Sequence, residues 1–136
     1  MGVPEVILLL DTHVVAWLAE DEGKFSKKAV QAIERAKRSG GGLAISSVTL
    51  FELAQQVVRK RIQMDVSLDL FLRDVETRFS VLQLSAAIAE RAVRLPESFP
   101  NDPMDRIIAA TALVEGIPLV TADERIRESG VVETIW

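Results

Sequence analysis

Short apolar segments alternate along this chain with longer segments of helical periodicity, and this alternation constrains the fold more than any other feature. The apolar segments are 5–10, 43–46, 81–84 and 118–121. The first is an almost unbroken apolar run, which is typical of a strand buried on both faces of a parallel sheet. Strands that alternate with helices predict a parallel sheet covered on both faces and joined by right-handed crossovers. We therefore expect an α/β fold, a three-layer α/β/α sandwich.

The segments between these strands carry helical spacing and recognisable helix ends. Helices are expected at 12–20, 26–39, around 50–58, 67–78, 85–95, 103–115 and 123–129, with a possible edge strand at 131–135. Ser26 and Asp102 suit the N-cap position, and Gly116 suits a helix stop. No repeat, low-complexity tract or linker divides the 136 residues, so residues 1–136 are expected to form one domain.

Composition excludes several kinds of protein. The chain has no cysteine and one histidine, which rules out disulfides, thiolate metal sites and a zinc centre built from histidines. Sixteen basic residues against twenty acidic ones argue against binding to nucleic acid through bulk positive charge. The longest apolar stretch, 6–10, is far too short to cross a bilayer, and no signal sequence precedes it. We expect a cytoplasmic protein with no membrane association.

Acidic residues follow most of the predicted strands. Asp11 closes the first strand, Glu52 lies in the helix after the second, and Asp123 comes just past the fourth. Asp105 lies in the first turn of the helix that begins after Asp102. Binding sites of open parallel sheets lie beyond the carboxyl ends of the strands. We therefore expect the four carboxylates to meet at one edge of the sheet.

Each acid also has an interpretation that involves no function. The pairs Thr49–Glu52 and Thr121–Glu124 have the spacing of a capping box, and Asp102–Asp105 has the same spacing at a helix start. Acids in a first helical turn are also favoured by the helix dipole. Asp11 differs, because a charge at the end of a buried strand requires a partner or a metal.

The convergence of four acids favours a metal site. Without a cation the carboxylates would repel one another, and hard oxygen ligands select Mg²⁺ or Mn²⁺. Such an ion can activate water for attack on a phosphodiester, so that no side-chain nucleophile is needed. The chain fits this chemistry, since it has no cysteine, a single histidine and no Ser/His/Asp set.

Four motifs in order resemble the PIN-domain ribonucleases and, among them, the VapC-type toxins of toxin–antitoxin pairs. The motifs are LLLDTHVVAWL at 8–18, ISSVTLFELA at 45–54, DPMDRIIAATA at 102–112 and LVTADE at 119–124, followed by VETIW at 132–136. The resemblance extends over essentially the whole chain. One departure is Pro100-Asn101, where related sequences often have a histidine before Asp-Pro.

The resemblance implies a function and a set of site residues. Mg²⁺ or Mn²⁺ would be held by Asp11, Glu52, Asp105 and Asp123, with Asp11 and Asp105 as direct ligands and Thr12 and Thr121 as supporting residues. The implied reaction is endonucleolytic cleavage of cellular RNA, such as transfer or ribosomal RNA. The implied partners are a second copy of the chain and an antitoxin whose C-terminal segment occupies the groove beside the acids.

Other residues have two interpretations each. His13 could be a general base or a ligand, but packing or hydrogen bonding at a helix start is favoured. Arg106 could orient an acid or contact phosphate, or form an ordinary surface ion pair. The basic run at 59–61 could complement helix carbonyls or contact RNA. The apolar residues within 50–58 exceed what a small monomer needs, which favours a homodimer.

Two functions other than a nuclease are considered for this chain: a signalling receiver domain and a non-catalytic binding module. A signalling receiver domain needs an adjacent acid pair after the first strand and a late lysine, but Asp11 has no acidic neighbour and no lysine follows Lys60. A non-catalytic PIN-like module would bind RNA or a partner without cutting it. Loss of an acid would favour that module, and all four acids are present.

Overall fold

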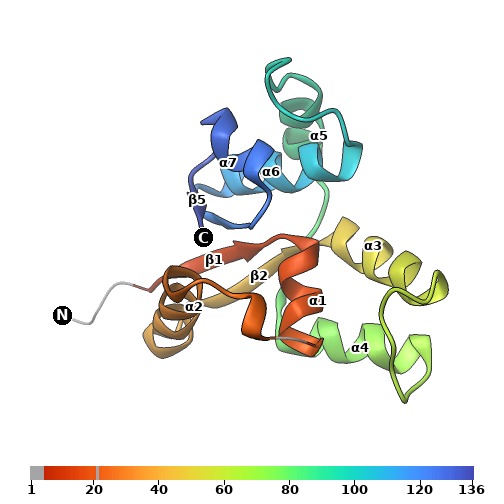
Figure 1. The fold of residues 1–136 in the computed structure, drawn as a ribbon. Helices are drawn as coiled ribbons and strands as arrows, with labels where there is room; N and C mark the ends of the chain where they lie inside the picture. Colours follow the sequence, from red (N-terminus) through yellow and green to blue (C-terminus); the bar gives the residue numbers. More distant parts are fainter. Residues whose placement is uncertain (1–4, 21) are drawn as a thin grey trace.

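The computed structural model describes residues 5–20 and 22–136 and contains a five-stranded parallel sheet (Figure 1). The strand order is β3-β2-β1-β4-β5, and each of the four strand pairs is parallel. The strands are β1 (Ile7–Leu10), β2 (Gly42–Ser46), β3 (Ser80–Leu82), β4 (Leu119–Val120) and β5 (Thr134–Ile135). Strand β1 is therefore central, with β2 and β4 as its neighbours.

Helices cover both faces of this sheet. They are α1 (Thr12–Glu20), the short 3₁₀ helix η1 (Glu22–Lys24), α2 (Lys27–Ser39), α3 (Ser47–Val58), α4 (Leu68–Arg78), α5 (Ala86–Val93), α6 (Pro103–Glu115) and α7 (Glu124–Ser129). Figure 1 shows α5, α6 and α7 on one side of β1 and β2, with α1, α2 and α4 on the other. The three-layer α/β/α architecture expected from the sequence is confirmed. Within the described ranges, no helix has the length and apolar character needed to cross a membrane.

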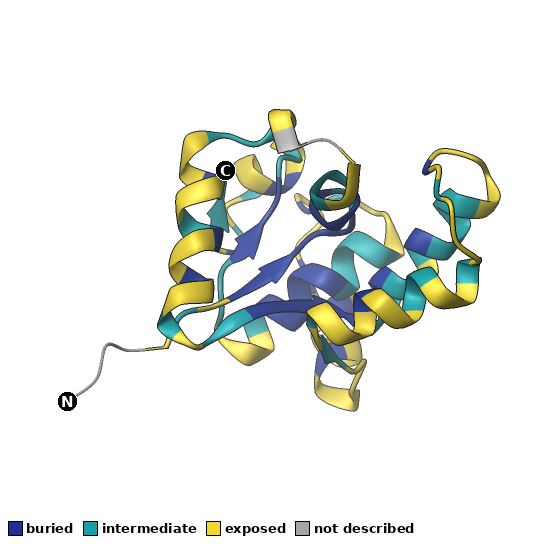
Figure 2. Ribbon diagram, turned by 90° about the horizontal axis from the view of Figure 1, so that it is seen from below, coloured by how far each residue is buried: buried dark blue, intermediate teal, exposed yellow. Residues whose placement is uncertain are grey.

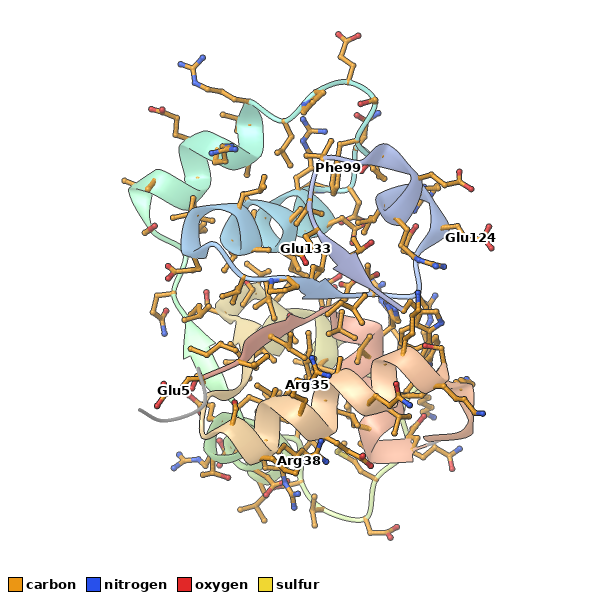
Figure 3. All side chains as sticks on the ribbon, turned by 90° about the vertical axis from the view of Figure 1, so that its left-hand side faces the viewer. Glu5, Arg35, Arg38, Phe99, Glu124 and Glu133 are labelled. Carbon is orange, nitrogen blue, oxygen red and sulfur yellow. The ribbon has the colours of Figure 1, made fainter. Side chains whose placement is uncertain are left out.

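The alternation of side chains along β1 divides the core in two. Leu8 and Leu10 pack into a cluster with α1, α2, α3 and α4, whereas Leu9 packs into a cluster with α6 and α7. All three are buried, as expected for a central strand with both faces covered. Figure 2 shows the buried strands at the centre and exposed residues on the outer helix faces. In Figure 3 the charged side chains of Arg38 and Glu124 lie at the periphery, whereas Phe99 lies inside.

Several predicted helix ends are confirmed. The Ser26 hydroxyl accepts a hydrogen bond from the Ala29 N–H, and the Asp102 carboxylate accepts from Met104 and Asp105. Gly116 ends α6 with φ of 67°, in the left-handed region that favours glycine.

Both predicted capping boxes that start at a threonine are wrong. Helix α3 begins earlier than expected, with Ser46 as its N-cap, so Thr49 and Glu52 lie inside the helix. Helix α7 has Asp123, not Thr121, as its N-cap. Two predicted strands are too long, since β1 spans only Ile7–Leu10 and the edge strand only Thr134–Ile135, whereas β2 begins one residue earlier than predicted, at Gly42.

Gly41 lies where the chain enters β2 beside the start of β1. A Cβ atom at Gly41 would lie 2.3 Å from the Val6 carbonyl oxygen, whereas one at Gly40 would meet nothing within 4 Å. Gly40 instead has φ of 86° as the C-cap of α2. The two neighbouring glycines are therefore required for different reasons, one for close backbone approach and one for its dihedral angles.

Gly41→Ala is expected to lower the free energy of unfolding by about 3 kcal/mol, because backbone must move to admit the methyl group. Gly40→Ala is the matched control and should cost only about 1 kcal/mol, the strain of a left-handed residue. Urea unfolding of both variants measures the difference. A Gly40 variant that is less stable than the Gly41 variant would show that the close approach to Val6 is not the stronger constraint.

Candidate functional site

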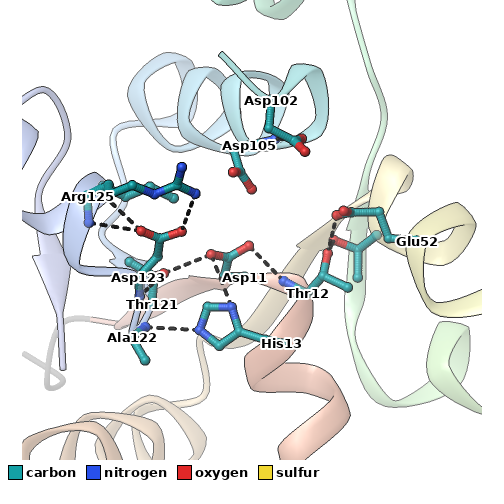
Figure 4. A network of polar contacts seen from close by, with 12 residues as sticks. Asp11, Thr12, His13, Glu52, Asp102, Asp105, Thr121, Ala122, Asp123 and Arg125 are labelled. Atoms are coloured by element: carbon teal, nitrogen blue, oxygen red, sulfur yellow. Dashed lines mark hydrogen bonds and ion pairs between the residues drawn. The ribbon is translucent and has the colours of Figure 1, made fainter. Parts of the chain in front are cut away.

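Asp11 is the buried centre of a polar network at the carboxyl ends of β1 and β4 (Figure 4). Its Oδ1 accepts a hydrogen bond from the Thr12 N–H at 2.9 Å, and its Oδ2 accepts from the Thr121 hydroxyl at 2.8 Å. The side chain is therefore fixed by the first residue of α1 and the first residue after β4. A carboxylate oxygen has two lone pairs, so Oδ1, which accepts one hydrogen bond, retains the capacity to bind a further group.

Thr12 connects Asp11 to α3. Its hydroxyl donates a 2.6 Å hydrogen bond to Oε1 of Glu52, and its oxygen lies 3.1 Å from the hydroxyl oxygen of Thr49. Because Thr12 has one hydroxyl proton and gives it to Glu52, Thr49 must be the donor in the second contact. Thr49 was assigned to a capping box from the sequence, and its place in this network was missed.

Glu52 has an altered ionisation because it is partly buried beside other acids. Burial raises its pKa, the hydrogen bond from Thr12 lowers it, and the charges of Asp11 and Asp102 raise it again. The net effect is a raised pKa, so the charged form of Glu52 is destabilised in the absence of a cation.

Asp105 has the largest change in pKa among the described acids of the site. It lies in the first turn of α6, and its side chain points toward Asp11 in Figure 4. Its pKa is raised to about 7. Burial is the largest cause, and the negative charges of the neighbouring acids add to it: Asp11, Asp102, Glu52 and Asp123. A carboxylate whose charge is opposed by four others is a strong candidate for a functional group.

Asp123 combines a structural contact with its position in the cluster. As the N-cap of α7 it accepts hydrogen bonds from the N–H groups of Arg125 and Ile126. Its other oxygen lies 3.4 Å from the Arg125 guanidinium, and its own N–H donates to the Thr121 hydroxyl. The helix-start interpretation of Asp123 is therefore confirmed, and it is compatible with a place in the site.

Asp102 is a fifth acid that the sequence suggested only as a helix cap. It caps α6 and also adds negative charge that raises the pKa of both Glu52 and Asp105. The signal that could have identified it is its spacing from Asp105, which places both residues at the same helix start.

The donor chemistry of the cluster fits a hard divalent cation, because every acidic ligand offers oxygen. As the side chains stand, however, no group of three or more His, Asp or Glu in 5–20 and 22–136 is arranged to hold a metal ion. The acids are near enough to raise one another's pKa, but no three of the described ones are placed around a common metal position. Binding of an ion would therefore require rotation of side chains around Asp11.

Among residues 5–20 and 22–136, no ion pair joins Arg106 to an acid. Its guanidinium donates to the carbonyl oxygens of Ala92, Leu95, Phe99 and Pro100. All three guanidinium nitrogens are thus engaged within the protein, and the expected ion pair or phosphate contact is replaced by a structural role. Arg106 fastens segment 92–100 to the first turn of α6.

Comparison with known proteins yields consistent matches. Residues 8–131 match the family described as PIN domain. Ribonuclease VapC22 of Mycobacterium tuberculosis is 38% identical over 120 residues, which cover 88% of this chain and 89% of that protein.

Solved structures share the fold at lower identity. VapBC2 from Rickettsia felis, bound to a promoter DNA fragment, has a TM-score of 0.71 and 18% identity, covering 95% of this chain and 97% of the other. A toxin–antitoxin complex from Klebsiella pneumoniae has a TM-score of 0.63 and 23% identity, covering 88% of each chain.

The raised pKa of Asp105 predicts how stability depends on pH in the metal-free protein. Because the folded pKa of about 7 exceeds the ordinary value, folding favours the protonated acid, and stability is lost as pH rises from about 4 through 7. In EDTA at pH 8, Asp105→Asn should therefore raise the free energy of unfolding by about 1 kcal/mol, and the gain should vanish near pH 4. Thermal or urea unfolding across this range measures both effects.

Asp69→Asn is the matched control, because Asp69 also lies in a first helical turn, on α4, but is exposed and paired with Arg73. Loss of its favourable helix-dipole contact should lower stability slightly at pH 8. If Asp105→Asn behaved in the same way, Asp105 would be an ordinary helix-start acid.

Proposed function

This chain belongs to the PIN domain family, and from that membership we propose that it is a metal-dependent endoribonuclease, the toxin component of a toxin–antitoxin pair. The observation that carries the proposal is a buried carboxylate, Asp105, crowded by other acids: burial first, and then the charges of its acidic neighbours, raise its pKa to about 7. Such crowding costs folding free energy, and a bound cation would offset that cost. The name of the relative from M. tuberculosis, a ribonuclease, supports RNA as the substrate.

We propose Asp11 and Asp105 as the direct ligands of Mg²⁺ or Mn²⁺, with Glu52 and Asp123 completing the acidic site. When bound, the ion would supply positive charge to the scissile phosphodiester and lower the pKa of the attacking water. Asp11 is oriented for this role by Thr12 and Thr121, whose hydrogen bonds restrict its carboxylate to one position. Preorganisation of this kind reduces the cost of arranging charges during the reaction.

Glu52 and Asp105 contribute differently because their surroundings differ. The Thr12 hydroxyl holds Glu52 at one side of Asp11. Asp105 carries a proton for about half of the time at pH 7 without a cation, since its pKa is about 7. Binding of a cation would displace that proton, so Asp105 is the acid whose charge would change when the metal binds.

The alternative is a PIN-like module that binds RNA or a partner without cutting it. All four acids of the family motifs are retained and lie around one site, which favours catalysis. The two functions are separated by a cleavage assay on cellular RNA with defined ends.

We expect cleavage in Mg²⁺ or Mn²⁺ that leaves 5′-phosphate and 3′-hydroxyl ends and stops in EDTA, because water rather than the ribose 2′-hydroxyl attacks. Asp11→Asn and Asp105→Asn should each lower the rate by at least about 100-fold, since each removes charge stabilisation worth several kcal/mol. End-mapping of the RNA products, together with rates for each variant, measures both expectations.

Asp69→Asn provides the control here too, and it should cleave at the rate of the parent chain. Cyclic phosphate ends, or full activity in EDTA, would contradict the proposed chemistry. Binding of RNA with no cleavage in any divalent cation would favour the non-catalytic module.

We further propose a homodimer that uses the outer face of α3. Within 50–58 the structure separates two kinds of residue: Leu50 and Leu53 pack into the core, whereas Phe51 and Val58 are 54% and 70% exposed. Exposed aromatic and aliphatic side chains on one helix are typical of an interface between subunits.

At micromolar concentration, light scattering should report about 30 kDa, twice the 15.0 kDa of one chain. Phe51→Ser should shift the mass toward 15.0 kDa, because it removes the largest exposed apolar side chain of α3. Val30→Ser, at an exposed apolar position on α2, is the control and should leave the mass unchanged. A parent chain that is monomeric at this concentration would contradict the proposal.

The proposed protein partner is an antitoxin, following the toxin–antitoxin complexes among the structural neighbours. A groove of about 730 Å³ between α1, α2 and α4 offers apolar walls from Leu18, Ile62 and Phe71. It lies on the side of the sheet opposite α6. A toxin that acts on cellular RNA works in the cytoplasm, which is the location we propose.

A further inference from the structure

His13, the only histidine of the chain, connects the residue that follows β1 with the segment that follows β4 (Figure 4). Its Nε2 accepts a hydrogen bond from the Ala122 N–H at 3.0 Å, and its Nδ1 lies 3.5 Å from Oδ2 of Asp11. Ala122 stands between Thr121, which supports Asp11, and Asp123, which is one of the four acids. The ring therefore contacts both the first acid and the turn that carries the fourth.

The contact with Ala122 determines the tautomer of the ring. A backbone N–H can only donate, so the Nε2 atom that faces it must present a lone pair. A neutral imidazole with an unprotonated Nε2 carries its proton on Nδ1. That proton then faces Oδ2 of Asp11 and adds a favourable contact to a buried carboxylate.

Oδ2 of Asp11 is also contacted by the segment that follows β4. The Thr121 hydroxyl donates to Oδ2 of Asp11, and the Asp123 N–H donates to the Thr121 oxygen. His13, Ala122, Thr121 and Asp11 thus form a closed loop of contacts. The position of the Asp123 backbone relative to Asp11 depends on both sides of this loop.

Packing around the ring restricts its rotation. Trp17, one helical turn later on α1, contacts His13 edge to face with ring centroids 4.9 Å apart. Trp17 in turn packs against Phe25 and Trp136. The imidazole is therefore packed against a cluster of aromatic rings, which restricts its orientation.

We propose that His13 is a positioning residue, which uses Nε2 to hold the backbone of residues 121–123 against Asp11 and thereby keeps Asp123 close enough to Asp11 to take part in binding a divalent cation. It acts neither as a general base nor as a metal ligand, because both of those roles require the lone pair that Ala122 occupies. This inference rests on the proposed metal-dependent function of the site.

The tautomer is tested directly by long-range ¹H–¹⁵N NMR correlation on the EDTA-treated parent chain. With a single histidine, the ring signals are assigned without ambiguity. We expect the proton on Nδ1 and Nε2 as an acceptor. A proton on Nε2 would overturn the inference, whether or not the protein cleaves RNA.

Two amide variants test the positioning role. The side-chain oxygen of His13→Gln can reach the place of Nε2 and accept from Ala122, whereas His13→Asn reaches only as far as Nδ1. Calorimetry with Mn²⁺ alone should give a Kd for the Gln variant within about threefold of the parent and a Kd about tenfold weaker for the Asn variant. Circular dichroism and melting curves confirm that both variants are folded.

The outcomes separate this inference from the proposed function. Equal Mn²⁺ affinity for the Gln and Asn variants would overturn the positioning role alone, provided that the parent binds Mn²⁺ and cleaves RNA. The expected order of affinities without any RNA cleavage would support the positioning role and contradict the nuclease. A parent chain that binds no Mn²⁺ would overturn both.

Discussion

Burial of carboxylates beside one another, at the carboxyl edge of the sheet, is the constraint on which the site depends. Because β1 is the central strand, the acid that follows it is surrounded by the elements that follow β2 and β4 and by α6. The cost is concentrated on Asp105, whose pKa rises to about 7 because the side chain is buried and because the charges of neighbouring acids oppose its own. A fold selected only for stability would not retain such an arrangement. The acids are best explained by the cation that would relieve their repulsion.

The acids differ in how firmly the protein holds them. Asp11 is fixed by Thr12 and Thr121, and Asp123 is fixed by its contacts at the start of α7. Asp105 is a direct ligand in the proposed site, yet its raised pKa shows that its surroundings favour the proton over the charge. Structural and functional interpretations of these acids are therefore compatible. A side chain can begin a helix and also contribute charge to the site.

Sequence periodicity predicted the architecture because each strand and helix carries a local pattern of apolar residues. Asp11 was identifiable for the same reason, as a charge that ends a buried run. The pattern did not determine where α3 begins, and so Glu52 was open to interpretation as part of a capping box. The carbonyl partners of Arg106 lie at the end of α5 and in the proline-containing segment after it, and no local pattern predicts that α6 contacts these segments. The strand order and the contact between His13 and Ala122 depend on pairing of distant segments, which no local pattern encodes.

Metal binding should release a proton from Asp105, because the raised pKa of this side chain keeps it protonated until a cation binds. Isothermal titration calorimetry with Mn²⁺ in buffers of different ionisation enthalpy counts the protons released. At pH 6 we expect Mn²⁺ binding to release close to one proton per ion, since Asp105 is then mostly protonated. At pH 8.5 we expect binding to release almost no protons. Binding at pH 6 without proton release, or no binding at either pH, would contradict the claim that these carboxylates form a cation site.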